Sequence, residues 1–295
     1  MPATLIDGKK IAEDIKQEVK RETEKLRAER GMTPGLAFIL VGENPASQSY
    51  VRMKGKACEE MGFYSVTERL PAETTEAYLL QLITRFNDDL RIHGILVQLP
   101  LPKHISEEKV LTAIDYRKDV DGFHPINVGR LVVGQECLKP CTPVGVQELL
   151  IRSGNDPAGK HVVVVGRSNI VGKPVMNILL QKQKGANAVV TIAHTGAKDI
   201  SMYTKQADIL IAAMGKAECI TGDMIRPGAV VIDVGINRVD DSSAKNGYRL
   251  VGDVHFASAS QVASAITPVP GGVGPMTIAI LMRNTLIAAK GGIYG

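Results

Sequence analysis

The first half of the chain alternates between short apolar runs and longer segments in which apolar residues recur every three or four positions. Residues 36–42 ("LAFILVG") and 92–100 ("IHGILVQLP") are apolar runs of strand length, and residues 64–70 ("YSVTERL") predict a third strand. A helix predicted to begin at Thr74 or Thr75 places four apolar side chains on one face: Leu79, Leu82, Ile83 and Phe86. Alternating strands and helices are typical of a parallel sheet covered by helices.

Three further helices are predicted in this half. Residues 44–62 ("NPASQSYVRMKGKACEEMG") read as a polar loop and a helix, and Gly62 stands where a left-handed C-terminal cap is expected. Residues 106–115 ("SEEKVLTAID") predict a short helix. Asp7 can cap a helix near the start of the chain. The apolar positions of that first helix recur every four residues at Ile11, Ile15 and Val19.

A second alternating series begins after residue 141. Thr142 is predicted as the N-cap and Pro143 as the first residue of a bridging helix that Gly154 ends. Residues 237–250 ("NRVDDSSAKNGYRL") contain an Asn-Gly pair and predict an exposed turn. Strands are predicted at residues 161–166, 188–194, 208–215 and 229–235. The expected fold class is α/β, with two α/β domains flanking a cleft and joined by long helices, the second holding a Rossmann-type parallel sheet.

The composition narrows the class of protein. With 295 residues, 44% of them hydrophobic and 22% charged, the chain is suited to a soluble globular protein of two domains. Its apolar runs are far shorter than the ~20 residues of a membrane-spanning helix, and its start lacks a signal peptide, so we expect a cytoplasmic protein without membrane contact. A net charge of +4, 4% aromatic residues and the absence of Trp argue against a nucleic-acid partner.

Neither disulfide bonds nor a metal site is expected. The cysteines include no Cys-x-x-Cys pair and are interpreted as reduced, buried thiols. No nearby His or Cys completes a zinc site around the second and third of them, and the six histidines form no ligand cluster. The four thiols are those of Cys58, Cys137, Cys141 and Cys219.

A glycine-rich turn follows the first strand of the second series. In residues 161–175 ("HVVVVGRSNIVGKPV"), Gly166 ends the strand, Ser168 takes the middle place of a dinucleotide fingerprint and Gly172 is its last glycine. The first glycine permits the tight turn, the last permits close packing of helix and strand, and the helix amides can meet a phosphate. The alternative is a plain tight turn without a ligand.

The residues around this turn favour NADP over NAD. An NAD site usually ends its second strand in Asp or Glu, which would repel a 2'-phosphate, whereas His194 and Thr195 stand here. Arg167, directly after the first glycine, adds a charge that can receive the phosphate. In the alternative interpretation, Arg167 and His194 are only exposed loop residues.

Tyr50 and Lys54 are four residues apart on one face of a predicted helix, among residues that should be buried. A lysine that loses solvation gives up its proton more easily and can act as a base, but it can also stretch past Tyr50 to water. Tyr-x-x-x-Lys is the catalytic pair of short-chain dehydrogenases as well. In those enzymes, however, the nucleotide glycines precede the pair, and here they follow it.

Further polar residues can complete a site around Lys54. Gln98 ends an apolar strand, where ligands collect in open parallel sheets, and its uncharged amide can orient the lysine. Asp121 could accept two parallel hydrogen bonds from an amino-pyrimidine, or it could cap a turn, as Asp119 could. Residues 266–281 ("ITPVPGGVGPMTIAIL") hold three prolines and three glycines and allow a ligand close to the backbone.

Taken together, these segments resemble the bifunctional methylenetetrahydrofolate dehydrogenase/cyclohydrolase family over nearly the whole chain. The resemblance rests on "SYVRMKGKA", "GILVQLPLP", "KDVDGFHPINVGRL", "PCTPVGV", "VVVVGRSNIVGKPV", "VIDVGINR" and "ITPVPGGVGPMT". It implies a homodimer whose final helix, after Pro275, folds back onto the first domain. The implied domains are residues 1–141 with 277–295, which bind folate, and residues 142–276, which bind NADP.

The resemblance also implies the site residues. The catalytic residues would be Lys54, Tyr50, Gln98 and Asp121. The folate site would comprise Tyr50, Lys54, Gln98, Leu99, Asp121, Pro268, Gly271 and Gly272. The NADP site would comprise Gly166, Arg167, Ser168, Ile170, Val171, Gly172, Pro174, His194, Thr195, Gly235 and Ile236.

The implied enzyme of one-carbon metabolism oxidises 5,10-methylenetetrahydrofolate with NADP to 5,10-methenyltetrahydrofolate and hydrolyses that product to 10-formyltetrahydrofolate. Three alternatives stay open from the sequence. One is a carbonyl reductase that uses Tyr50 as an acid, the second is a noncatalytic nicotinamide sensor, and the third is a monofunctional dehydrogenase of the same family.

Overall fold

The computed structural model describes residues 2–244 and 247–294. Contacts divide the chain into two compact units. The three-stranded unit consists of Glu13–Cys141 and Ile278–Gly295, and the six-stranded unit consists of Met1–Ala12 and Thr142–Thr277. Each unit is named after the parallel sheet that it contains.

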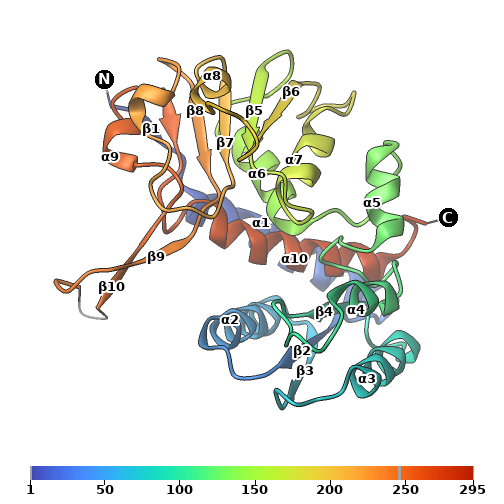
Figure 1. Cartoon of the computed structure of the whole chain (residues 1–295). Coiled ribbons are helices and arrows are strands. Elements are labelled where there is room, and N and C mark those ends of the chain that lie inside the picture. The colour runs from blue at the N-terminus through green and yellow to red at the C-terminus, as the bar shows by residue number, and fades with distance from the viewer. Residues whose placement is uncertain (1, 245–246, 295) are drawn as a thin grey trace. The chain divides into compact units, whose positions relative to one another are not determined.

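The three-stranded unit has the strand order β3-β2-β4, with both neighbours parallel to the central strand. β2 (Gly35–Val41) is buried at every residue, because it is covered on both faces. The flanking strands are β3 (Tyr64–Leu70) and β4 (Gly94–Val97). The helices that contribute to this unit are α1 (Gly8–Arg30), α2 (Pro45–Met61), α3 (Glu76–Asp88), α4 (Glu107–Ala113), α5 (Pro125–Val132) and α10 (Val273–Lys290) (Figure 1).

The predicted helix ends of this unit are confirmed by their caps. Thr75 accepts a hydrogen bond from the backbone N–H of Tyr78 at 3.3 Å. Asp7, which belongs to the six-stranded unit, accepts one from the backbone N–H of Lys10 at 3.0 Å at the start of α1. Gly62 adopts φ 71°, the left-handed conformation that ends α2. The four apolar residues predicted on one face of α3 pack in a single buried cluster with residues of β2 and β4.

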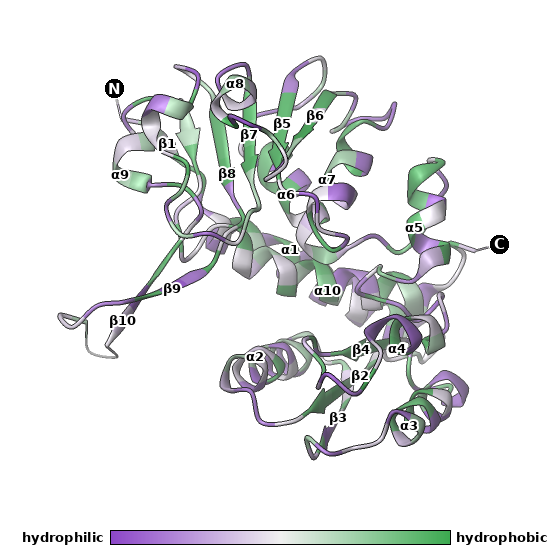
Figure 2. Ribbon diagram, viewed as in Figure 1, coloured by the Kyte–Doolittle hydropathy of each residue, from purple (hydrophilic) through white to green (hydrophobic). Residues whose placement is uncertain are grey.

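The six-stranded unit has the strand order β1-β11-β8-β7-β5-β6, and all its neighbouring strands are parallel. Its strands are β1 (Thr4–Leu5), β5 (His161–Val165), β6 (Val189–Ala193), β7 (Ile209–Ala212), β8 (Val230–Asp233) and β11 (Ala265–Ile266). Figure 2 shows β5, β7 and β8 as strongly hydrophobic, as expected for strands buried on both faces. The predicted α/β class with a Rossmann-type parallel sheet is thereby confirmed.

The other elements of this unit are short. A two-stranded antiparallel hairpin is formed by β9 (Asn237–Asp240) and β10 (Tyr248–Val251), and it extends away from the sheet (Figure 1). Residues 245–246, which hold part of the predicted Asn-Gly turn, lie outside the described residues. The helices are α6 (Cys141–Arg152), α7 (Gly172–Leu179), α8 (Ser201–Thr204), α9 (Phe256–Ala259) and the 3-10 turn η1 (Gly222–Met224).

The structure differs from the sequence interpretation at several places. Residues 237–250, predicted as an exposed turn, include β9 and most of β10, which pair with each other, and α5 was not predicted. α6 begins at Cys141, so Thr142 lies inside the helix, and its hydroxyl meets that of Thr277 at 2.8 Å instead of capping. The first residues of the chain group with the six-stranded unit, because β1 pairs with β11 at the edge of its sheet. No helix within the described ranges is long and apolar enough to cross a membrane.

Burial predicts which leucines of the three-stranded unit stabilise it. Leu79 is 0% exposed, so we expect Leu79→Ala to lower the free energy of unfolding by about 2–5 kcal/mol through lost contacts and a residual cavity. Leu90 is 91% exposed, and Leu90→Ala serves as the matched control, with a change within about 0.5 kcal/mol. Urea unfolding followed by circular dichroism measures both, and equal losses would contradict the packing described.

Candidate functional site

Lys54 lies on the buried face of α2 and is only 6% exposed. The helix is fixed at its start by Asn44, whose side chain accepts the backbone N–H groups of Ala46 and Ser47 at 3.0 and 3.1 Å. With the Gly62 cap at the other end, the register of α2 directs Lys54 inward. The alternative in which Lys54 stretches to water is wrong for this structure.

The ammonium of Lys54 meets an amide at the end of β4. Lys54 Nζ donates to Gln98 Oε1 at 3.0 Å, and Gln98 Nε2 donates to the carbonyl oxygen of Leu99 at 2.8 Å. Because the carbonyl of Leu99 can only accept, the amide is oriented with its oxygen toward the lysine. The predicted pairing is therefore present, and both ends of the Gln98 amide are held.

The two aspartates of the segment after α4 have different surroundings. Asp119 is buried and accepts the backbone N–H of His124 at 2.8 Å and the side-chain amide of Asn127 at 2.9 Å, so it is the residue that holds the turn. Burial raises the pKa of Asp121, and the positive charge of Lys54 is the main opposing influence. Asp121 is thus placed within electrostatic reach of Lys54.

Cys141 is a neighbour of this group that the sequence interpretation did not assign to the site. Its buried thiol donates its one proton to the carbonyl of Val120 at 3.3 Å. Burial and the charge of Asp121 raise the pKa of Cys141 well above its usual value, so the thiol keeps its proton. Asn284 of α10 donates to the same Val120 carbonyl at 2.8 Å. Nothing in the sequence of the segments "KDVDG" and "PCTP" indicated that Cys141 would contact Val120.

The remaining residues of the predicted folate site are more dispersed. Tyr50 lies one turn before Lys54 on α2 and is partly buried, and within the described residues no hydrogen bond joins it to Lys54 or Gln98. Three other predicted folate residues, Pro268, Gly271 and Gly272, belong to the six-stranded unit, where they follow β11. A Cβ added to Gly272 would lie 2.7 Å from the carbonyl oxygen of Pro268, so this segment is folded tightly on itself, and Gly271 has φ 110°.

The glycine turn after β5 packs closely against neighbouring backbone. Gly166 has φ 133°, and a Cβ there would lie 2.1 Å from the carbonyl oxygen of Ala213. A Cβ on Gly172 would lie 2.1 Å from the carbonyl oxygen of Gly166. Ser168 accepts the backbone N–H of Val171 at 3.1 Å, which shapes the loop before α7. These close approaches fit the fingerprint roles of the two glycines.

The ends of β5 and β6 bring two basic side chains together. Arg167 Nη1 lies 3.5 Å from His194 Nε2, and His194 Nδ1 accepts the backbone N–H of Gly196 at 3.0 Å. Arg167 and Thr195 are exposed, so both can reach a ligand. No carboxylate occupies the residue that follows β6, where an NAD site would need one.

The other predicted cofactor residues lie at the same edge of the sheet. Ile170 is exposed and Val171 partly buried ahead of α7, Pro174 is buried inside that helix, and Gly235 and Ile236 follow β8. Since β5, β6 and β8 run parallel, their carboxyl ends lie along one edge. Ligands of open α/β sheets bind at this edge.

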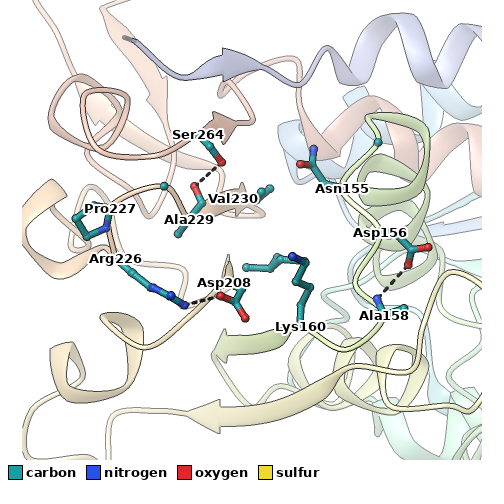
Figure 3. Close-up of a pocket in the computed structure, with 13 residues that line it drawn as sticks. Asn155, Asp156, Ala158, Lys160, Asp208, Arg226, Pro227, Ala229, Val230 and Ser264 are labelled. Atoms are coloured by element: carbon teal, nitrogen blue, oxygen red, sulfur yellow. Dashed lines mark hydrogen bonds and ion pairs between the residues drawn. The ribbon is translucent and has the colours of Figure 1, made fainter.

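A cavity of about 590 Å³ lies at the opposite edge of the same sheet (Figure 3). Two acidic and two basic residues line it: Asp156, Lys160, Asp208 and Arg226. Arg226 pairs with Asp208, and Asp156 accepts the backbone N–H of Ala158 at 3.0 Å. The volume of this cavity alone does not identify it as a binding site. In the described part of the chain, no three His, Cys, Asp or Glu side chains are grouped as metal ligands.

Family comparison covers both units. The model of the tetrahydrofolate dehydrogenase/cyclohydrolase catalytic domain matches residues 6–121. The model of the NAD(P)-binding domain of tetrahydrofolate dehydrogenase/cyclohydrolase matches residues 140–292. The two matches follow the order of the chain and leave only short segments unmatched.

Similar proteins and structures agree with these matches. The bifunctional protein FolD of Moorella thermoacetica is 61% identical over 290 residues, which are 98% of this chain and 100% of that protein. The FolD methylenetetrahydrofolate dehydrogenase/cyclohydrolase structure from Campylobacter jejuni has a TM-score of 0.92 and 49% identity, covering 98% of this chain and 99% of that one. A Trypanosoma brucei methylenetetrahydrofolate dehydrogenase-cyclohydrolase, complexed with NADP and an inhibitor, has a TM-score of 0.92 and 41% identity, covering 98% of both chains.

The close approach at Gly166 generates a prediction for cofactor binding. Gly166→Ala forces the turn to shift away from Ala213, at a cost on the order of 1–3 kcal/mol, so we expect NADP affinity to fall by about 10-fold or more. Gly129→Ala is the control, because Gly129 lies in α5 with open space around its Cα. Isothermal titration calorimetry with NADP measures both variants. Unchanged affinity in Gly166→Ala would show that the turn does not hold the cofactor.

Proposed function

The chain belongs to the tetrahydrofolate dehydrogenase/cyclohydrolase family, and we propose that it oxidises 5,10-methylenetetrahydrofolate with NADP and hydrolyses the resulting 5,10-methenyltetrahydrofolate to 10-formyltetrahydrofolate. The observation that carries the proposal is the hydrogen bond from the buried Lys54 to Gln98. A structural lysine gains little from such a position, because desolvation of an ammonium is costly unless it is paired. A role in exchanging protons with a ligand explains why a lysine is kept at this position despite the cost of its desolvation.

The oxidation step requires little of the side chains beyond positioning. Hydride leaves the methylene carbon, and the cation that remains is stabilised by its two neighbouring nitrogens, so no protein base is required. NADP, when bound, supplies the hydride acceptor. Fixing the reacting atoms in the correct geometry can contribute ~7 to 11 kcal/mol. The residues proposed to fix NADP are those around Gly166 and Gly172, where an added Cβ would meet the backbone.

The hydrolysis step needs protons to move, and Lys54 is the group proposed to move them. Water adds to the methenyl cation and loses one proton, which gives a neutral hydroxyl adduct. The bond from that carbon to one ring nitrogen then breaks as the nitrogen gains a proton and the hydroxyl loses its own to become the formyl carbonyl, so that one proton is released to solvent overall. Gln98 holds Lys54 Nζ in place without adding a negative charge, and Leu99 fixes the Gln98 amide. One nitrogen can therefore take a proton from water and return it to the leaving nitrogen.

Asp121 and Tyr50 are proposed to bind the folate. The carboxyl group of Asp121 can accept two parallel hydrogen bonds from the amino-pyrimidine edge of the pterin. Its pKa is raised by burial, while the positive charge of Lys54 favours the carboxylate. Tyr50, partly exposed one turn from Lys54, is suited to stack on the aromatic linker of the folate.

The preference for NADP over NAD is assigned to the end of β6. Arg167 and His194 lie 3.5 Å apart there, and the hydroxyl of Thr195 follows directly. A 2'-phosphate can accept hydrogen bonds from a guanidinium and a hydroxyl at this point.

We also propose that the protein is a cytoplasmic homodimer, as the family resemblance implies. Light scattering of the purified chain tests the dimer.

The central test is Lys54→Met, which keeps an apolar stem of similar length and removes the amine. We expect hydrolysis of methenyltetrahydrofolate to fall by about 10²- to 10⁴-fold, the usual contribution of an acid-base group, while NADP affinity is unchanged. The measurement follows the loss of the methenyl chromophore, with calorimetry for NADP.

Lys56→Met is the matched control for that variant. Lys56 lies on the same helix with its side chain 75% exposed, so its removal should leave hydrolysis unaffected. Hydrolysis at the wild-type rate in Lys54→Met would refute the assignment. Reduction of simple ketones by the wild-type chain, without turnover of folates, would instead support the carbonyl reductase alternative.

A further inference from the structure

Two aspartates outside the predicted sites are buried at the carboxyl edge of the six-stranded sheet. Asp233 is the last residue of β8 and is 3% exposed, and Asp253 follows β10 and is 0% exposed. Buried carboxylates are costly unless hydrogen bonds replace their lost hydration. Their partners therefore indicate what they do.

Asp253 accepts hydrogen bonds from several backbone N–H groups of the loop that follows β7. Its carboxylate accepts the N–H groups of Met214 at 2.5 Å, Gly215 at 2.9 Å and Lys216 at 2.9 Å. It also accepts the side-chain amide of Asn237 at 2.9 Å. Three successive amides that converge on one carboxylate fix the course of a loop that has no regular secondary structure of its own.

Asp233 ties the loop after β8 to the segment that carries Asp253. Its carboxylate accepts the N–H of Gly235 at 3.0 Å, that of Asp253 at 2.9 Å and that of Val254 at 2.9 Å. Burial raises the pKa of Asp233 to about 6, the three backbone donors oppose that rise, and the nearby charge of Asp253 adds to it. The three donors thus favour the charged form of the buried Asp233 carboxylate.

Glycines make this arrangement possible. A Cβ on Gly235 would lie 2.3 Å from Asp253 Oδ1, and a Cβ on Gly252 would lie 1.8 Å from Asp233 Oδ2. Neither position accommodates a side chain without moving a carboxylate. We call this group of two aspartates and two glycines the aspartate clamp: Asp233, Gly235, Gly252 and Asp253.

The loops that the aspartate clamp holds lie at the carboxyl ends of the strands, where NADP is proposed to bind. Gly235 is itself a predicted cofactor residue, and Ile236 follows it. The loop after β7 begins at Ala213, whose carbonyl oxygen is the atom closest to the Cβ position of Gly166. A displacement of this loop would therefore reach the glycine turn directly.

We propose that Asp253 and Asp233 are positioning residues for the pyridine nucleotide, which fix the loops after β7 and β8 in the conformation that binds NADP. The inference rests on the proposed function, because it assumes that NADP binds at this edge. Neither aspartate needs to touch NADP or take part in hydrolysis.

The test is Asp253→Asn, which keeps the shape of the side chain but turns one acceptor atom into a donor facing the amides. We expect the dissociation constant and the KM for NADP to rise by roughly 10-fold or more, with kcat at saturating NADP and cyclohydrolase activity within about 2-fold of wild type. Without NADP, hydrogen-deuterium exchange of residues 213–216 should be faster than in the wild-type chain.

Asp208→Asn is the matched control. Asp208 sits at the opposite edge of the same sheet, where it accepts the backbone N–H of His161 at 2.9 Å and pairs with Arg226 (Figure 3). Its substitution should leave NADP binding unchanged. Asn237→Ala, which removes one donor without altering a buried charge, should raise the KM for NADP by roughly 3-fold or more and replaces Asp253→Asn if that variant does not fold.

The outcomes separate the inference from the proposed function. If the wild-type chain neither binds NADP nor oxidises methylenetetrahydrofolate, the proposed function fails. If the wild-type chain does both and Asp253→Asn, or its substitute Asn237→Ala, retains wild-type NADP affinity, the inference is overturned. A parallel loss of cyclohydrolase activity would also overturn it, since it would show general damage in place of loop positioning.

Discussion

The proposed chemistry depends on one constraint: an ammonium group taken out of water must be given a partner. Lys54 is held by Gln98, an amide that adds no charge, and that choice leaves the nitrogen available to a ligand. The surrounding structure serves this contact. Caps at Asn44 and Gly62 fix the register of α2, β4 delivers Gln98, and the turn held by Asp119 delivers Asp121.

The nucleotide site follows a different principle, in which close backbone approaches at glycines define the shape and the buried carboxylates of Asp233 and Asp253 hold the loops. Parallel strands end at one edge, and glycines allow the loops there to approach each other within distances that no side chain permits. The carboxylates of the aspartate clamp accept hydrogen bonds from the backbone N–H groups of these loops and so hold them in place. Folate chemistry is thus assigned to polar side chains, and the shape of the nucleotide site to glycine turns together with the aspartates that hold its loops.

Much of this organisation can be predicted from the sequence, because it is local. The period of apolar residues gave β2 and α3, the caps at Thr75 and Gly62 were recognisable, and the glycine spacing marked the turn after β5. What was missed depends on contacts between distant segments. The two-residue strand β1 has no pattern of its own and exists only because it pairs with β11. The contact of Cys141 with Val120 and the loops gathered by Asp253 likewise have no signal in spacing.

The most direct test of the account is a crystal structure of the chain with NADP and a stable analogue of methenyltetrahydrofolate. The account predicts that Lys54 Nζ, still bonded to Gln98, lies within about 2.6–3.2 Å of the one-carbon unit or of a single water that touches it. An analogue whose one-carbon unit binds away from Lys54, with the lysine in contact only with protein, would contradict it.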